Sequence, residues 1–131
     1  MDCIFCKIIK GDIPSYTVYE DDIVKAFLDI NPSTNGDLLI VPKNHYENML
    51  DIPEDVYLHI HKISKEMYSL LKEKLNIDGI TLVQNNFYGQ EIKHYHLHLT
   101  PRYTNDGLTN SFNKDELLEI EKVFKKIKEA I

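Results

Sequence analysis

Three histidines alternate with apolar residues in one short stretch of the chain. His94, His96 and His98 are separated by Tyr95 and Leu97. Because the side chains of a β-strand point alternately to its two faces, a strand here would place all three imidazoles on one surface and the apolar residues in the core. Three histidines on one face pack no better than Thr or Val would. We therefore expect them to perform chemistry or to bind a metal.

Imidazole has two useful forms beside a phosphate group. The neutral form can attack phosphorus and become covalently attached to it, whereas the protonated form stabilises phosphate oxygens or gives a proton to the leaving group. The middle residue, His96, is the natural nucleophile, and His98 can donate to a phosphate oxygen or to the leaving group. We therefore expect His96 and His98 to be catalytic residues that cleave a nucleoside monophosphate from its leaving group, with water attacking in a second step.

Two cysteines near the N-terminus form a second candidate site. Cys3 and Cys6 are the only cysteines of the chain, and two residues separate them. In a reducing compartment this spacing favours a metal site or a redox pair over a structural disulfide. The βαβ pattern that usually accompanies a redox pair of this kind is absent from the sequence. A metal site, however, needs further ligands besides the two thiolates.

Short apolar stretches predict the strands that would position these residues. Residues 17–20 and 23–28 flank a tight turn and favour a hairpin. The loop that follows is rich in Pro, Asn and Gly, as expected for a turn before another strand. Three further strands are predicted at residues 37–42, 80–85 and 92–101, the last of which contains the histidines.

Apolar residues recur at helical spacing in two regions. The first predicted helix begins at Pro53 and ends between Asn76 and Gly79. Asn113 is a candidate N-cap for the second predicted helix. The apolar stripe of that helix consists of Leu117, Ile120, Phe124, Ile127 and Ile131. Strands before and after a long helix, without βαβ repeats, favour an α+β domain with an antiparallel sheet.

Length and composition limit the classes of function. The 131 residues, of which 43% are hydrophobic, are enough for one core, and we expect a single domain over residues 1–131. A net charge of -6 argues against a DNA-binding surface, which needs many Lys and Arg contacts to phosphate. The sequence has neither a secretory signal nor a membrane-spanning stretch, so we expect a cytoplasmic protein without a membrane partner.

Several segments together resemble the histidine triad (HIT) family of nucleotide hydrolases and transferases. Residues 94–100 resemble the family signature, and other matching segments follow the family's order along nearly the whole chain. These are residues 3–9, 11–15, 27–32 and 41–45, and Gly89 with Gln90. The resemblance is to the bacterial-type nucleotide-binding branch. It implies a HIT-like fold, with an antiparallel sheet of about five strands and flanking helices, that forms a two-fold homodimer.

The resemblance also implies a reaction and a purine nucleotide site. The expected reaction releases a nucleoside 5′-monophosphate, AMP by preference, from an amine or phosphate leaving group through a covalent intermediate on His96. The implied nucleotide-binding residues are Phe5, Ile8, Ile13, Phe27, Leu28, Asp29, Ile30, Asn85, Gln90 and His98. A carboxylate such as Asp29 can accept both ribose hydroxyls, and amides can hold phosphate oxygens. The loop before Gly89 is shorter than is common in the family, so Asn86 remains an alternative to Asn85.

Bacterial members of the family imply a use for the cysteines. They bind zinc through two cysteines and two histidines, which correspond here to Cys3, Cys6, His45 and His94. Zinc held by four protein ligands is structural and leaves His96 free to react. The spacing is not that of a zinc finger, so DNA recognition does not follow.

Three alternatives remain open from the sequence. In one, His94, His96 and His98 share a catalytic metal that activates water. The outer two would lie about 13 Å apart along a strand, which makes convergence on one ion difficult. A second alternative is a dinucleoside polyphosphate hydrolase. The third is a nucleotide-binding regulatory module with little catalysis.

Overall fold

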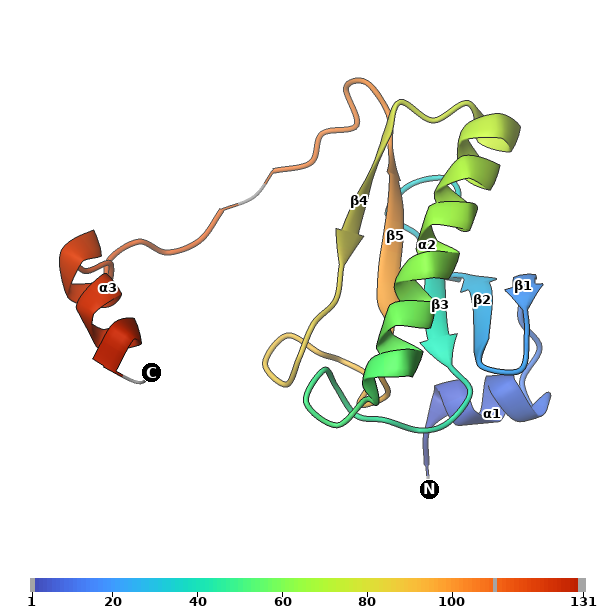
Figure 1. The fold of residues 1–131 in the computed structure, drawn as a ribbon. Coiled ribbons are helices and arrows are strands. Elements are labelled where there is room, and N and C mark those ends of the chain that lie inside the picture. Colours follow the sequence, from blue (N-terminus) through green and yellow to red (C-terminus); the bar gives the residue numbers. More distant parts are fainter. Residues whose placement is uncertain (1, 110, 130–131) are drawn as a thin grey trace.

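A five-stranded antiparallel sheet forms the centre of the protein. The computed structural model describes residues 2–109 and 111–129. In the sheet the strands follow the order β1-β2-β3-β5-β4 (Figure 1). Their bounds are Thr17–Glu20 for β1, Val24–Leu28 for β2, Leu38–Pro42 for β3, Gly79–Val83 for β4 and Leu97–Arg102 for β5. The predicted α+β class and antiparallel sheet are confirmed.

One face of the sheet is covered by α2, which spans Glu54–Leu75. Its buried residues include Ile60, Ile63 and Met67, which pack with alternate residues of the strands, among them Leu38 and Leu99. Asn76 ends the helix in the left-handed conformation, with φ at 54°. Both predicted ends agree with this helix, and its detection from the sequence follows from the clear apolar period of a long amphipathic helix.

The other face of the sheet contacts a short helix, α1, which spans Ile4–Lys10. Phe5 and Ile8 of α1 pack against Phe27 and Leu39, whose side chains point away from α2. The sequence did not predict α1. Seven residues with two buried positions are too few to show a helical period. Gly11 ends the helix with φ at 88°, a conformation that glycine adopts without strain.

The strand that follows the first two histidines begins later in the sequence than predicted. β5 begins at Leu97 rather than at residue 92, so only His98 of the three histidines lies within the strand. The predicted division between faces nevertheless holds for the apolar residues, because Tyr95, Leu97 and Leu99 are all buried in the cluster beneath α2, which contains none of the three histidines. Residues 91–94 bend instead of pairing, and this bend turns the His94 ring toward the N-terminal cysteines.

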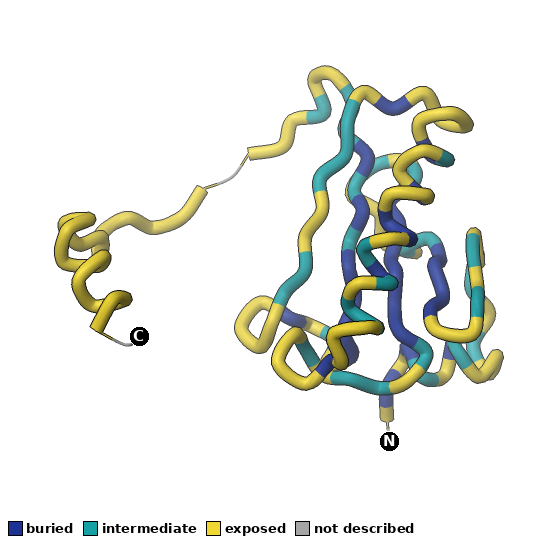
Figure 2. The backbone as a smooth tube through the Cα atoms, in the orientation of Figure 1, coloured by how far each residue is buried: buried dark blue, intermediate teal, exposed yellow. Residues whose placement is uncertain are grey.

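The last helix also differs from the prediction. α3 spans Ile120–Glu129 and begins seven residues after Asn113, whose side chain accepts a hydrogen bond from the Asp115 amide in a separate turn. The described residues of α3 are all exposed, and the helix stands apart from the sheet (Figures 1 and 2). Ile131, the end of the predicted stripe, lies outside the described residues. Within the described chain, none of the helices has the length and apolarity needed to cross a bilayer.

Candidate functional site

His96 is buried, and its hydrogen bond defines the state of the imidazole. Its Nδ1 atom lies 2.7 Å from the backbone carbonyl oxygen of His94. A carbonyl can only accept, so Nδ1 carries the proton and donates it. In a neutral imidazole this leaves Nε2 with a free lone pair. His96 is therefore held as the tautomer that can act as a nucleophile through Nε2.

The pKa of His96 is lowered below its usual range, which favours this neutral form. Burial of the ring is the main cause. The hydrogen bond to the His94 carbonyl opposes the shift, a positive charge on His98 would add to it, and the carboxylates of Asp29 and Glu91 oppose it. The net direction means that His96 is uncharged near neutral pH.

His98 lies beside His96, on β5 between β3 and β4. The two ring centroids are 4.8 Å apart, closer than the 6–7 Å that strand geometry alone predicts for alternate residues. His98 pairs with Leu39 of β3 on one side and with Val83 of β4 on the other. Pairing with strands on both sides fixes the backbone of His98. Its half-buried ring remains partly accessible from the cavity.

A cavity of about 560 Å³ opens in front of these two histidines. Nine of the ten residues predicted to bind the nucleotide line it, and His96 lines it as well. Its apolar wall includes Phe5 and Phe27, whose rings meet edge to face with centroids 5.6 Å apart. Phe5 also packs edge to face on His96, at 5.0 Å. The cavity therefore joins an apolar slot to the His96 imidazole.

Polar groups lie at separate places around this cavity. One carboxylate oxygen of Asp29 accepts the backbone N–H of Asn31 at 2.9 Å, which holds the side chain and leaves the second oxygen free. Asn85 lines the cavity, whereas the side chain of Asn86 accepts hydrogen bonds from Gln84 and from the Met49 amide. Of the two asparagines, the structure brings Asn85 to the histidines.

Gln90 is the predicted residue that does not line the cavity. Its side-chain amide donates to the Glu47 carbonyl at 2.6 Å and accepts from the Phe87 amide at 3.0 Å. Only 5% of the residue is exposed. Both ends of the amide are thus used to tie two loops together. The expectation of a direct phosphate contact therefore has no support in this arrangement.

Eight residues of the cavity lining were not predicted, and two of them directly follow Gln90. Glu91 and Ile92 line the cavity beside His96 but were not assigned a role from the sequence. Their position directly after Gln90 was the available signal. In a strand, these two consecutive side chains would point to opposite faces. The bend observed at residues 91–94 instead directs both Glu91 and Ile92 into the cavity.

Four side chains form a compact group near the N-terminus of α1. The Sγ atoms of Cys3 and Cys6 and one ring nitrogen each of His45 and His94 all lie within 4.8 Å of one another. Cys3 Sγ is 3.4 Å from His94 Nδ1, Cys6 Sγ is 3.4 Å from His45 Nδ1, and the two Nδ1 atoms are 3.1 Å apart. These are the four residues predicted to bind a metal.

The donor set fits a structural zinc ion. Tetrahedral zinc, with bonds of about 2.3 Å to sulfur and about 2.0–2.1 Å to nitrogen, separates its ligand atoms by about 3.3–3.8 Å, close to the distances found here. His94 Nε2 lies 2.8 Å from the Pro42 carbonyl and donates to it, so Nδ1 is bare in the neutral ring. Burial lowers the pKa of His94 to about 4, which keeps it neutral.

The shared-metal alternative has no geometric support. The group of metal-ligating side chains found among the described residues contains His94 but neither His96 nor His98. His94 Nδ1 faces the cysteines, while His96 Nδ1 is occupied by its bond to the His94 carbonyl. The three imidazoles therefore do not converge on one ion.

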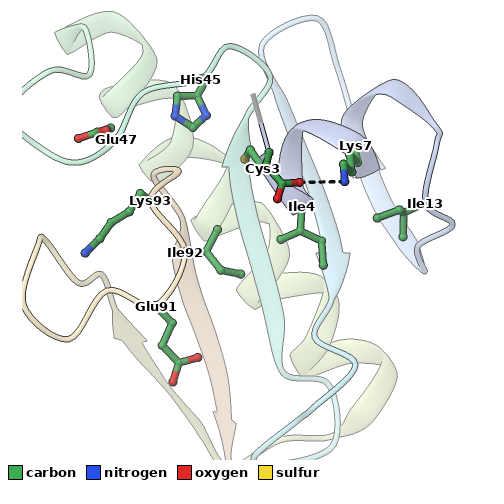
Figure 3. A pocket seen from close by; sticks show the side chains of 10 residues that line it. Cys3, Ile4, Lys7, Ile13, His45, Glu47, Glu91, Ile92 and Lys93 are labelled. Carbon is green, nitrogen blue, oxygen red and sulfur yellow. Dashed lines mark hydrogen bonds and ion pairs between the residues drawn. The ribbon is translucent and has the colours of Figure 1, made fainter.

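A second cavity, of about 690 Å³, lies between α1 and the segment 91–93 (Figure 3). Cys3 and His45 form part of its wall, next to Ile4 and Ile92. Figure 3 shows Lys93 extending toward the neighbouring loop and away from the cavity centre. The second cavity thus borders both the metal-ligating group and the nucleotide-sized cavity.

The comparison with known sequences identifies the family of this chain. The family model described as "HIT domain" matches residues 10–105. An uncharacterised HIT-like protein of Methanocaldococcus jannaschii is 46% identical over 128 residues, covering 96% of this chain and 98% of that protein. The chain belongs to the HIT family.

Two relatives with named activities are more distant. The adenosine 5′-monophosphoramidase HNT1 of Saccharomyces cerevisiae is 40% identical, over 76% of this chain and 62% of that protein. The adenylylsulfatase HINT3 of Arabidopsis thaliana is 37% identical, over 82% of this chain and 55% of that protein.

Solved structures show the same architecture. A HIT family protein of Bacillus subtilis superposes with a TM-score of 0.84 at 33% identity, covering 100% of this chain and 98% of that one. A Zn-bound histidine triad family protein of Mycobacterium smegmatis gives 0.79 at 30% identity, covering 100% and 99% of the two chains. The family relationship supports a nucleotide hydrolase at the level of the family as a whole.

Proposed function

We propose that this protein is a nucleoside phosphoramidase that cleaves AMP from an amine or phosphate leaving group. The observation that carries the proposal is the tautomer and the position of the His96 imidazole. Its Nδ1–H is committed to the His94 carbonyl, and its ring lines the cavity beside His98. A buried, neutral imidazole with a free Nε2 at the edge of a nucleotide-sized cavity is suited to nucleophilic attack on phosphorus.

The reaction runs in two displacements. His96 Nε2 forms a bond to phosphorus, and the bond from phosphorus to the leaving group breaks, with a proton supplied by protonated His98 or by water. A water molecule then attacks the same phosphorus, AMP is released, and the bonding electrons return to Nε2. Each step moves charge onto phosphate oxygens, where His98 and Asn85 can donate hydrogen bonds.

Nucleotide binding uses the other side chains of the cavity. The apolar wall that contains Phe5 and Phe27 takes the purine ring, which buries apolar surface. The free oxygen of Asp29 accepts from a ribose hydroxyl. The activity named for the yeast relative, an adenosine 5′-monophosphoramidase, supports this choice of substrate.

Zinc has a structural role in this proposal. Cys3, Cys6, His45 and His94 would hold the ion with no open position, so that its contribution is to link α1 to the segment before β5. Cys3 is also the N-cap of α1, and its sulfur accepts the Cys6 amide at 3.3 Å. Fixing α1 in turn fixes Phe5 in the wall of the nucleotide cavity. The Zn-bound Mycobacterium smegmatis relative supports this metal.

The working form in this proposal is a homodimer of one-domain chains spanning residues 1–131. Two features favour self-association. β4 is an edge strand, with Leu82 and Val83 about two-fifths exposed, and the apolar residues of α3 are exposed. An unpaired edge and an exposed apolar helix face are both surfaces that second copies commonly cover. Sedimentation equilibrium should give the mass of two chains.

The reaction is tested with two substrates in parallel, an adenosine 5′-phosphoramidate and a dinucleoside polyphosphate. The proposal predicts release of AMP and free amine from the first, at a higher kcat/KM than cleavage of the second. Faster cleavage of the polyphosphate would identify a dinucleoside polyphosphate hydrolase instead. Tight AMP binding with turnover of neither substrate would identify a binding module.

A further inference from the structure

Glu91 lies where the two cavities meet. Ile4, Ile13, Glu91 and Ile92 line both the nucleotide cavity and the second cavity, so these four residues form a border common to the two spaces. On the nucleotide side, the neighbour of this border is His96. A group attached to phosphorus opposite His96 can therefore extend past Glu91 into the second cavity, which is about 690 Å³ in volume and thus large enough for a small amine.

The positive charges of the second cavity are already engaged. Lys7 Nζ is paired with Asp2 at 3.0 Å (Figure 3). Lys93 Nζ donates to the carbonyl oxygens of Phe87 at 2.7 Å and of Gln90 at 3.0 Å, on the side of the loop. Each ammonium group has three N–H donors, of which Lys7 uses one and Lys93 uses two, so an anionic ligand would share both charges with partners that are already in place.

Of the three carboxylates that line the second cavity, only that of Asp2 is engaged in this way among the described residues. Among the described residues, the carboxylates of Glu91 and Glu47 accept no hydrogen bond and form no ion pair, although both line the second cavity. A carboxylate at the border of a phosphate site repels the phosphate of the substrate, which is a cost unless the ligand brings a compensating positive charge. Glu91 would disfavour a sulfate or polyphosphate leaving group for the same reason.

We propose that Glu91 is a specificity residue that selects nucleoside phosphoramidates whose leaving amine carries a second, protonated amine, and that the second cavity receives this amine. The inference rests on the proposed function. The chemistry at phosphorus is unchanged, since the phosphorus–nitrogen bond breaks and the departing nitrogen gains one proton. The second ammonium group keeps its charge throughout and contacts the Glu91 carboxylate.

Three adenosine 5′-phosphoramidates with leaving groups of equal length test the inference. Their leaving amines are 1,4-diaminobutane, 1-aminopentane and 4-aminobutanoate, which carry a terminal ammonium, methyl and carboxylate group. The values of kcat/KM are compared between the wild-type protein and the Glu91→Gln variant, so that intrinsic leaving ability cancels. Glu73→Gln, on the exposed side of α2, removes the same charge at a distance and serves as the control.

The wild-type protein should prefer the diamine over the carboxylate substrate, and Glu91→Gln should reduce that ratio by about two- to fivefold, the range expected for a partly exposed ion pair. Glu73→Gln should leave the ratio unchanged. Equal ratios in the wild-type protein and Glu91→Gln would overturn the inference while turnover still supported the proposed function. An equal decrease of kcat/KM for all three substrates in Glu91→Gln would also overturn it.

Binding provides a readout that does not depend on turnover. Dissociation constants of the three compounds are measured on His96→Asn, with and without Glu91→Gln. A diamine preference that disappears with Glu91→Gln supports the inference, even if the wild-type protein cleaves none of the compounds and the proposed reaction fails. Equal affinity for the three compounds on His96→Asn overturns the inference.

Discussion

The backbone carbonyl of His94 accepts the Nδ1–H of His96 at 2.7 Å, while the His94 ring faces the cysteines. His94 therefore contributes its side chain to the metal-ligating group and its carbonyl to the orientation of the His96 imidazole. Phe5 contacts both rings edge to face, with centroids 5.9 Å from His94 and 5.0 Å from His96. The His94 backbone and the Phe5 ring thus connect the metal-ligating group to the nucleotide cavity.

Replacing His96 with Asn should remove turnover but not nucleotide binding. The Asn side chain can still donate to the His94 carbonyl, so the local fold is kept while the nucleophile is lost. We expect kcat for an adenosine phosphoramidate to fall roughly ten-thousand-fold. Calorimetry should show an AMP affinity close to that of the wild-type protein. His61→Asn, on α2, should change neither quantity, and comparable turnover by His96→Asn would contradict the assignment.

Removal of zinc should affect stability and nucleotide affinity more than the chemical step. We expect one ion per chain by elemental analysis, and loss of this ion in Cys6→Ser but not in His61→Asn. Chelation should lower the melting temperature and raise KM, because α1 and Phe5 are no longer fixed. A catalytic metal contributes several kcal/mol to the transition state, so complete loss of kcat on chelation would show that the ion takes part in the reaction.

Gln90→Ala should destabilise the protein because the side chain joins two loops. The substitution leaves the Glu47 carbonyl and the Phe87 amide without their partners. We expect the free energy of unfolding to fall by about 1–3 kcal/mol, measured by urea denaturation followed by circular dichroism. Gln84→Ala is the matched control and should cost less, since its bonds lie nearer the surface. An unchanged free energy for Gln90→Ala would argue against a structural role.

The hairpin between β1 and β2 should make stability depend on acid pH through Asp21. Burial alone would raise the pKa of Asp21, but hydrogen bonds from His59, Val24, Tyr19 and Ile23 outweigh it and hold the pKa far below its usual range. The stabilisation is therefore present above about pH 4, where the unfolded chain has lost its proton, and is lost as the pH falls toward the folded-state pKa.

The measurement compares Asp21→Asn with the wild-type protein at several pH values. At pH 7 the variant should be less stable by about 1–3 kcal/mol, and the difference should shrink progressively below about pH 4. The exposed neighbour Asp22 provides the control Asp22→Asn, which changes net charge equally and should have little effect. A difference that stayed constant down to pH 2.5 would mean that the carboxylate charge is not what stabilises the turn.

The sequence predicted the features that leave a regular pattern. The alternation at Tyr95, Leu97 and Leu99 identified the buried side of β5 and of the segment before it, and the apolar period identified α2. Features that depend on distant partners could not be read in this way. Gln90 bonds to Glu47, 43 residues away, and nothing local distinguishes that use of an amide from a phosphate contact.

The family resemblance supplied the residues of the two sites, and the structure brings most of them together. Cys3 and His94 are 91 residues apart in the chain, yet their side chains lie within 3.4 Å, as the resemblance implied. The bend at residues 91–94 could not be predicted from strand propensity, and it is this bend that directs Glu91 into the cavity. Asn113 failed as an N-cap because its side chain closes a local turn.

Trapping of labelled nucleotide on His96 tests the central claim most directly. The protein is mixed with an adenosine phosphoramidate labelled in the adenosine, quenched within one turnover and digested, and the peptides are analysed by mass spectrometry under conditions that preserve phosphorus–nitrogen bonds. We expect a peptide that contains AMP attached to His96, formed and lost at rates consistent with turnover. Single-turnover release of AMP with no adduct at His96, or with an adduct on another residue, would contradict it.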